Sequence, residues 1–206
     1  SFGGLRGPAL MSMVPEVDRG VLWVGGSSFS QQIERSTHYI TFEMLFAESI
    51  AYPSRNDRGI MIAALQSIWD SLDAETFLPY HENGLEGLIQ PFQMLYITSM
   101  NDFQVSTLSC DRAVRTAGIS NLQSSPWHPW GVQLENGPIE GSGVVYFDGG
   151  FPEVPIGNLA GSLDYHSHAH GQIRGVPEAY NMAFEYLDSG IIIDTCNDSC
   201  TFEGVW

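Results

Sequence analysis

The order of apolar and polar positions along the 206 residues predicts helices alternating with buried strands. Short apolar runs rich in β-branched or aromatic residues are typical of strands. Such runs lie at residues 20–26, 92–100, 143–150 and 190–195. Apolar residues three and four positions apart are typical of helices. This spacing occurs just after residue 1, over 105–116 and over 176–187.

Residues 27–87 follow a helical pattern almost throughout, as in THYITFEMLFAESIAY and DRGIMIAALQSIWDSL. The stretch is too long for a simple crossover between two parallel strands. We therefore expect a crossover helix enlarged by a helical cap that covers a pocket. Helices that only pack against the domain would give the same pattern.

The alternation of helices and strands predicts an α/β domain with a parallel sheet. Three interior strands make a poor sheet, however, because parallel strands are covered on both faces and need neighbours at both edges. We therefore expect residues 1–206 to be one part of a single domain. Strands from an upstream segment or a second chain would complete its sheet.

The charge of the chain restricts its partners. Its 24 acidic residues exceed its 8 basic residues, all of them Arg, and the net charge is -16. Such a surface repels nucleic acid and anionic membranes, so we exclude both as partners. No apolar run approaches the roughly 20 residues of a transmembrane helix.

Two of the three cysteines, Cys196 and Cys200, lie in the short segment TCNDSC. A disulfide closing this loop is favoured over two free thiols, and it indicates an oxidising compartment. We therefore expect a secreted, periplasmic or extracellular protein. Cys110 lies in a helical pattern and is interpreted as a small buried hydrophobic residue.

Two segments carry candidate catalytic residues. SFGG at residues 1–4 matches the second half of the G-x-S-x-G nucleophile elbow, with Ser1 as the nucleophile and the Phe2 N–H as one oxyanion-hole donor. A flexible end would show the same letters. Asp102 directly follows the strand at 92–100, where a carboxylate emerges at the carboxyl edge of a parallel sheet. An N-cap for the next helix is the alternative role for Asp102.

Three histidines, His166, His168 and His170, follow the strand at 143–150 in DYHSHAHGQIRG. One of them should orient on Asp102 and take the proton of Ser1, and we choose His170. The other two remain alternatives. Arg174 would pair with a structural acid or with a substrate carboxylate, the structural role being favoured.

The chain resembles a group of secreted bacterial α/β-hydrolases typical of myxobacteria. The resemblance covers nearly all residues and is carried by SFGG, VPEVDRGVL, ERSTHYITF, AYPSRNDRG, NDFQV, HGQIRGVPEAY and DTCNDSC. It implies the C-terminal half of an α/β-hydrolase fold, with the histidine of an HGxxR motif at His170. It also implies an esterase or lipase-like activity that needs no cofactor. The N-terminal half of the same precursor would be its partner.

A start at the nucleophile suggests that a precursor is cut before Ser1 and that both pieces stay in one fold. A strained, activated serine can attack the preceding carbonyl. Trimming by another protease, or a break in the chain, explains the same start.

Three other functions remain open. An N-terminal-nucleophile amidase would use the amine of Ser1 as its base, but that fold needs antiparallel sheets. A zinc hydrolase would use HSHAH with Asp164, because histidines two apart share one face of an extended segment. A binding module without catalysis would use SSPWHPWGV for recognition, although Trp127, His128 and Trp130 are more often packing residues.

Overall fold

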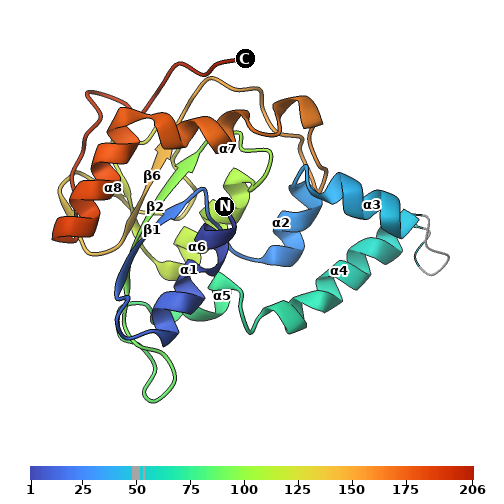
Figure 1. The fold of residues 1–206 in the computed structure, drawn as a ribbon, viewed down its shortest axis with the longest axis horizontal. Coiled ribbons are helices and arrows are strands. Elements are labelled where there is room, and N and C mark those ends of the chain that lie inside the picture. The colour runs from blue at the N-terminus through green and yellow to red at the C-terminus, as the bar shows by residue number, and fades with distance from the viewer. Residues whose placement is uncertain (48–51, 53) are drawn as a thin grey trace.

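The computed structural model describes residues 1–47, 52 and 54–206 (Figure 1). The α-helices are α1 (Phe2–Met13), α2 (Phe29–Arg35), α3 (Tyr39–Ala47), α4 (Arg55–Trp69), α5 (Ala74–Phe77), α6 (Thr107–Ala117), α7 (His168–Gln172) and α8 (Pro177–Ser189). The 3-10 turns are η1 (Leu78–Tyr80), η2 (Leu163–Tyr165) and η3 (Ile173–Gly175). None of the described helices is both long and apolar enough to cross a membrane.

The strands form one main sheet and one small ribbon. They are β1 (Arg19–Trp23), β2 (Gln93–Ser99), β3 (Ser120–Leu122), β4 (Leu134–Glu135), β5 (Ile139–Glu140), β6 (Gly143–Phe147) and β7 (Ile191–Ile192). The main sheet has the order β1-β2-β6-β3-β4, and every neighbouring pair in it is parallel. The predicted α/β class with a parallel sheet is therefore confirmed.

The central strand β2 explains why both faces of the sheet are covered. Its successive side chains point to opposite faces; six of its seven residues are buried, and the four from Met94 to Ile97 are apolar. Met94 and Tyr96 pack in the core against α1, α5 and α6, whereas Leu95 and Ile97 pack in the core against α8. Figure 1 shows α8 on one side of the sheet and α1, α5 and α6 on the other.

The strand predictions hold for the centre of the sheet and fail at its far edge. Strands β1, β2 and β6 lie within one residue of the predicted runs at 20–26, 92–100 and 143–150 or inside them. The run at 190–195 yields only β7, which pairs antiparallel with β5 outside the main sheet. The sequence does not predict strands β3 and β4, because runs of two or three residues show no period.

The predicted cap region divides into two parts. Helices α2, α3 and α4 extend away from the sheet in Figure 1. By contrast, α5 and η1 lie in the core, where Ala74, Phe77 and Leu78 are buried. Residues 48–51 and 53 of the predicted cap lie outside the described residues.

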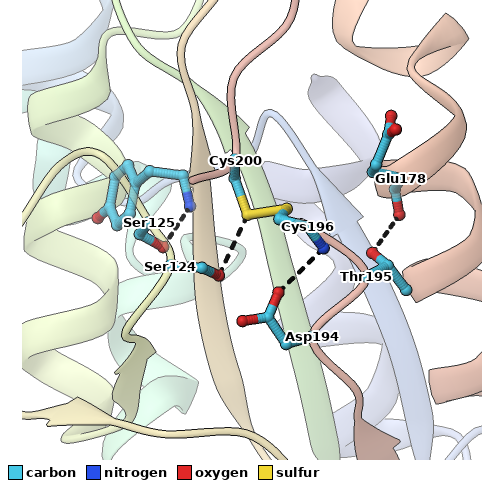
Figure 2. The surroundings of a disulfide bond; sticks show 8 residues. Ser124, Ser125, Glu178, Asp194, Thr195, Cys196 and Cys200 are labelled. Carbon is cyan, nitrogen blue, oxygen red and sulfur yellow. Dashed lines mark hydrogen bonds between the residues drawn. A yellow bond between two sulfur atoms is a disulfide. The ribbon is translucent and has the colours of Figure 1, made fainter. Parts of the chain in front are cut away.

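The predicted disulfide between Cys196 and Cys200 is present (Figure 2). The amide of Cys200 donates to the carbonyl of Ser124 at 2.9 Å, and the amide of Asp148 donates to the carbonyl of Cys200 at 3.0 Å. The bridged loop therefore fixes the C-terminal segment beside the carboxyl end of β6. Cys110 is free and buried, as predicted.

Candidate active site

A buried hydrogen bond joins Asp102 to His170 at the carboxyl edge of the sheet. Asp102 is 1% exposed and lies three residues after β2. One oxygen of its carboxylate, Oδ2, lies 2.7 Å from Nδ1 of His170. The other, Oδ1, accepts the amides of Gln104 at 2.7 Å and Val105 at 3.0 Å. Because a carboxylate only accepts, Nδ1 of His170 carries a proton and Nε2 is left as the acceptor.

The alternative role of Asp102 as a helix cap does not apply. Helix α6 begins at Thr107, and its N-cap is Ser106. The carboxylate of Asp102 instead satisfies two amides of the turn between β2 and α6. These two bonds fix the carboxylate, so that its second oxygen remains directed at His170.

His170 lies in α7, and its side chain is buried. The side chain of Arg174 donates to the carbonyl of His170 at 2.8 Å, and its second nitrogen lies 3.4 Å from Nε2. Arg174 is exposed, and among the described residues it has no carboxylate partner. The structural acid that we expected for Arg174 is therefore not among the described residues.

Ser1 is the N-cap residue of α1, and its hydroxyl makes no capping hydrogen bond. Its nitrogen donates to the carbonyl of Trp23 at the end of β1. Because Trp23 is the last residue of β1, this hydrogen bond places Ser1 at the carboxyl edge of the sheet, the edge at which Asp102 follows β2. No hydrogen bond joins the hydroxyl of Ser1 to an imidazole within the described part of the chain. The structure thus pairs Asp102 with His170 and leaves the serine contact unmade.

A side chain at Gly4 is excluded for steric reasons. A Cβ on Gly4 would meet the Cα of Gly25 at 2.7 Å and the carbonyl oxygen of Trp23 at 2.8 Å. Only glycine lets the start of α1 approach the end of β1 this closely. Phe2 is the first residue of α1, where an N–H has no acceptor inside the helix.

His166 contacts helices α2 and α3 at their junction rather than Asp102. Its Nδ1 lies 2.6 Å from the hydroxyl of Thr37, and its ring packs edge-on against His38 with centroids 4.8 Å apart. Gln104 donates to the carbonyl of His166 at 2.9 Å. Burial, followed by the neighbouring His38 and His170, lowers the pKa of His166.

His168 points in a third direction, into a cluster of aromatic rings formed by Phe151, Tyr165 and Trp206. The segment HSHAH is helical rather than extended, with α7 beginning at His168. Histidines two apart on a helix do not share a face. The arrangement on which the zinc hypothesis depends is therefore absent from this segment.

A cavity of about 390 Å³ opens beside Ser1, between α1, α2 and α3. A larger one, about 880 Å³, lies at the opposite end of the strands and is lined by polar residues such as Arg19, His81 and Gln93. Ligands of parallel α/β sheets bind at the carboxyl ends of the strands. The smaller cavity is therefore the one relevant to Ser1.

Sequence reasoning missed Thr37, His38 and Gln104, which join α2, α3, the turn after β2 and the histidine segment. Thr37 and Gln104 are ordinary polar residues in the sequence. Only their positions in NDFQV and ERSTHYITF, two of the motifs that carry the resemblance, could have drawn attention to them.

The aromatic segment SSPWHPWGV is anchored by Trp127. Its indole donates to Asp111 at 3.1 Å, and the hydroxyl of Tyr146 donates to the same carboxylate at 2.8 Å. Burial raises the pKa of Asp111. Trp127 is thus fixed by hydrogen bonds although it is 39% exposed, whereas Trp130 is 90% exposed.

Comparisons with models of protein families, with curated proteins and with solved structures gave no match. The resemblance to bacterial α/β-hydrolases therefore remains a hypothesis that depends on the residues of this chain.

Proposed function

We propose that this chain carries the catalytic residues of a serine hydrolase acting on esters, with Ser1 as nucleophile, His170 as general base and acid, and Asp102 as its orienting carboxylate. The observation that carries the proposal is the buried 2.7 Å contact between Asp102 and His170. A histidine held this way keeps Nε2 free to accept a proton, which is the tautomer that the reaction requires.

The chemistry follows from these positions. Nε2 of His170 takes the hydroxyl proton of Ser1, whose oxygen attacks the ester carbonyl and forms an acyl-enzyme as the alcohol leaves with that proton. Water then attacks the acyl group with His170 again as base, and the acid is released. Arg174 must move away from Nε2 before Ser1 can approach, and its exposure permits this.

The unmade contact between Ser1 and His170 is compatible with this mechanism. Catalytic hydrogen bonds are often long without substrate and shorten in the reacting complex. The oxyanion of the intermediate needs at least two donors as a rule. The Phe2 N–H is one of them, and we propose that the upstream segment supplies the other.

The same upstream segment would complete the sheet. Strand β1 lies at one edge of the main sheet, next to β2 only. The nitrogen of Ser1 donates to Trp23 of this strand, so a chain leading into Ser1 would run along the open edge. We infer that the N-terminal half of the precursor adds its strand there. The disulfide Cys196–Cys200 favours a secreted or periplasmic setting for the assembled enzyme.

One observation favours a second candidate, the N-terminal-nucleophile amidase. Burial, followed by the charge of Arg174, lowers the pKa of a free amine at Ser1 to about 5. Such an amine would be an unprotonated base at neutral pH. The parallel sheet and the hydrogen bond of this nitrogen to Trp23 favour the hydrolase instead.

The test is labelling with a fluorophosphonate probe together with hydrolysis of p-nitrophenyl esters, using the full protein. We expect labelling and turnover in the unchanged protein and loss of both in Ser1→Ala. His170→Asn should lose turnover about a thousandfold or more. His168→Asn is the matched control, because His168 lies two residues away and its ring packs against the rings of Phe151, Tyr165 and Trp206.

The outcomes separate the candidates. Turnover that survives His170→Asn but not loss of Ser1 would favour the terminal amine as base. Rates in the unchanged protein equal to those of Ser1→Ala would refute the hydrolase and favour the binding module. Activity removed by a chelator in a protein that resists the fluorophosphonate would instead indicate a metal enzyme.

A further inference from the structure

The cavity beside Ser1 is lined by six apolar residues and six polar ones, and none of these is acidic or an arginine. We propose that it binds an uncharged, apolar acyl chain of medium length, so that the substrates are esters of medium-chain carboxylic acids. This inference rests on the proposed function, because it takes Ser1 as the nucleophile. The apolar part of the cavity's lining comes from α1, α2, α3 and the turn after β2. These apolar residues are Phe2, Leu5, Phe29, Ile33, Phe42 and Val105.

The described lining of the cavity contains no Asp, Glu or Arg. Several of its polar side chains have partners within the protein: Gln32 donates to the carbonyl of Gln104 at 2.6 Å, and Nε2 of His38 lies 3.2 Å from the side-chain oxygen of Gln104. A carboxylate or ammonium group on the acyl chain would lose its water without gaining a counter-ion. The net charge of -16 adds repulsion against an anionic chain. The chain that fits is therefore uncharged along its length.

The volume of the cavity limits the length of that chain. At about 390 Å³ it lies near the lower end of the range of ligand pockets, roughly 300–1,000 Å³. Leu5 and Val105 are buried and form its inner wall, whereas Phe2 and Phe42 are exposed at its mouth. A short acyl group would leave the inner wall uncovered, and a long one would extend past the mouth into water.

The experiment compares kcat/KM for p-nitrophenyl acetate, butyrate, hexanoate, octanoate and palmitate. Each buried methylene should raise kcat/KM by up to about fourfold. The rise should stop at hexanoate or octanoate, and palmitate should give no further increase. A p-nitrophenyl ester with a carboxylate at the end of its acyl chain should react at least about tenfold more slowly than the neutral ester of equal length.

Two variants of α3 test whether this cavity sets the preference. Thr41 lines the cavity and is exposed, so Thr41→Trp fills the space without disturbing the core. We expect it to lower kcat/KM for octanoate at least about tenfold while acetate changes less than about twofold. Met44 is exposed on the same helix and does not line the cavity. Met44→Trp should leave the chain-length profile unchanged.

Failure of this inference is distinguishable from failure of the proposed function. Turnover that depends on Ser1 but is flat with chain length, or that responds equally to both tryptophan variants, would overturn the acyl cavity and leave the hydrolase standing. If no ester is hydrolysed, binding of 1-octanol measured by calorimetry decides about the cavity alone. Binding that Thr41→Trp abolishes supports an apolar-chain site, and binding unchanged in that variant overturns it.

Discussion

Asp102 divides its two oxygens between the backbone and His170, and this division allows fold and chemistry to be tested separately. In Asp102→Asn the amide oxygen still accepts from Gln104 and Val105, but the amide nitrogen faces Nδ1 and favours the wrong tautomer of His170. We expect kcat to fall about a thousandfold to ten-thousandfold. Ester turnover and the melting temperature are measured together. A kcat within about tenfold of the unchanged protein would remove Asp102 from the mechanism.

A second prediction concerns the effect of a side chain at Gly4 on stability. In Gly4→Ala the new Cβ would collide with backbone atoms of Gly25 and Trp23. Backbone atoms cannot move aside as the end of a flexible side chain can. We expect a loss of about 1–3 kcal/mol in the free energy of unfolding. The matched control is Gly59→Ala, also within a helix, where the nearest atom is the carboxylate of Glu34 at 3.6 Å. It should stabilise by about 0.5–1 kcal/mol. Urea unfolding measures both, and equal effects would contradict the steric argument.

The location of a single residue could be predicted from the sequence where it depends on the position of that residue relative to a strand. Asp102 could be found because any residue just after a buried parallel strand emerges at the carboxyl edge. His170 was chosen from three histidines, and the structure pairs it with Asp102. Thr37 could not be found, because its contact with His166 joins residues 129 positions apart and leaves no local pattern.

The turn that contains His166 joins the histidine segment to α2 and α3, and it should make folding sensitive to pH. The pKa of His166 is lowered from its ordinary value of 6.5, so the unfolded chain binds the proton more readily than the folded one. The free energy of unfolding should therefore decrease as the pH falls through about 6.5 toward the lower folded value. Burial is the largest cause of this lowering, followed by the neighbouring His38 and His170, whereas Asp102 acts in the opposite direction.

Urea unfolding on either side of pH 6.5 measures this dependence. In His166→Asn the decrease with falling pH should be smaller. His128→Asn serves as the control because His128 is exposed and lies in the aromatic segment. An identical slope in His166→Asn and the unchanged protein would show that His166 does not contribute.

At the scale of elements, length decided which predictions succeeded. Strand β2 has seven residues and α8 has thirteen, and each gives a clear periodic pattern. Strands β3 and β4 have three and two residues; β3 pairs with β6, and β4 pairs with β3. Such strands form because their neighbours already exist. Their own sequence therefore carries little information about them.

The whole molecule combines a well-packed centre with a main sheet that ends in β1 at one edge and in β4 at the other. From the sequence we expected a parallel sheet with too few strands, and the structure supplies β3 and β4 on one side of β6. Strand β1 on the other side is only half buried. An open parallel edge is a site for pairing with another strand. The sequence could predict this need but not which edge, since strand order depends on contacts between distant residues.

The charge of the molecule leads to the last prediction. A net charge of -16 on 206 residues produces self-repulsion that is stronger in the compact state than in the unfolded one. Salt should therefore raise the melting temperature as the screening length falls from about 30 Å at 0.01 M to about 10 Å at 0.1 M ionic strength. Salt also weakens ion pairs, which opposes this effect.

The ion pairs are too few to reverse the expected sign. The described residues contain two Arg–carboxylate pairs, Arg58–Glu43 and Arg112–Glu75, each with a partly exposed partner. Pairs of this kind contribute about 0–1 kcal/mol each. Calorimetry in sodium chloride, with sucrose as an uncharged control for exclusion effects, measures the balance. A melting temperature that falls with salt would mean that local pairing outweighs the net charge.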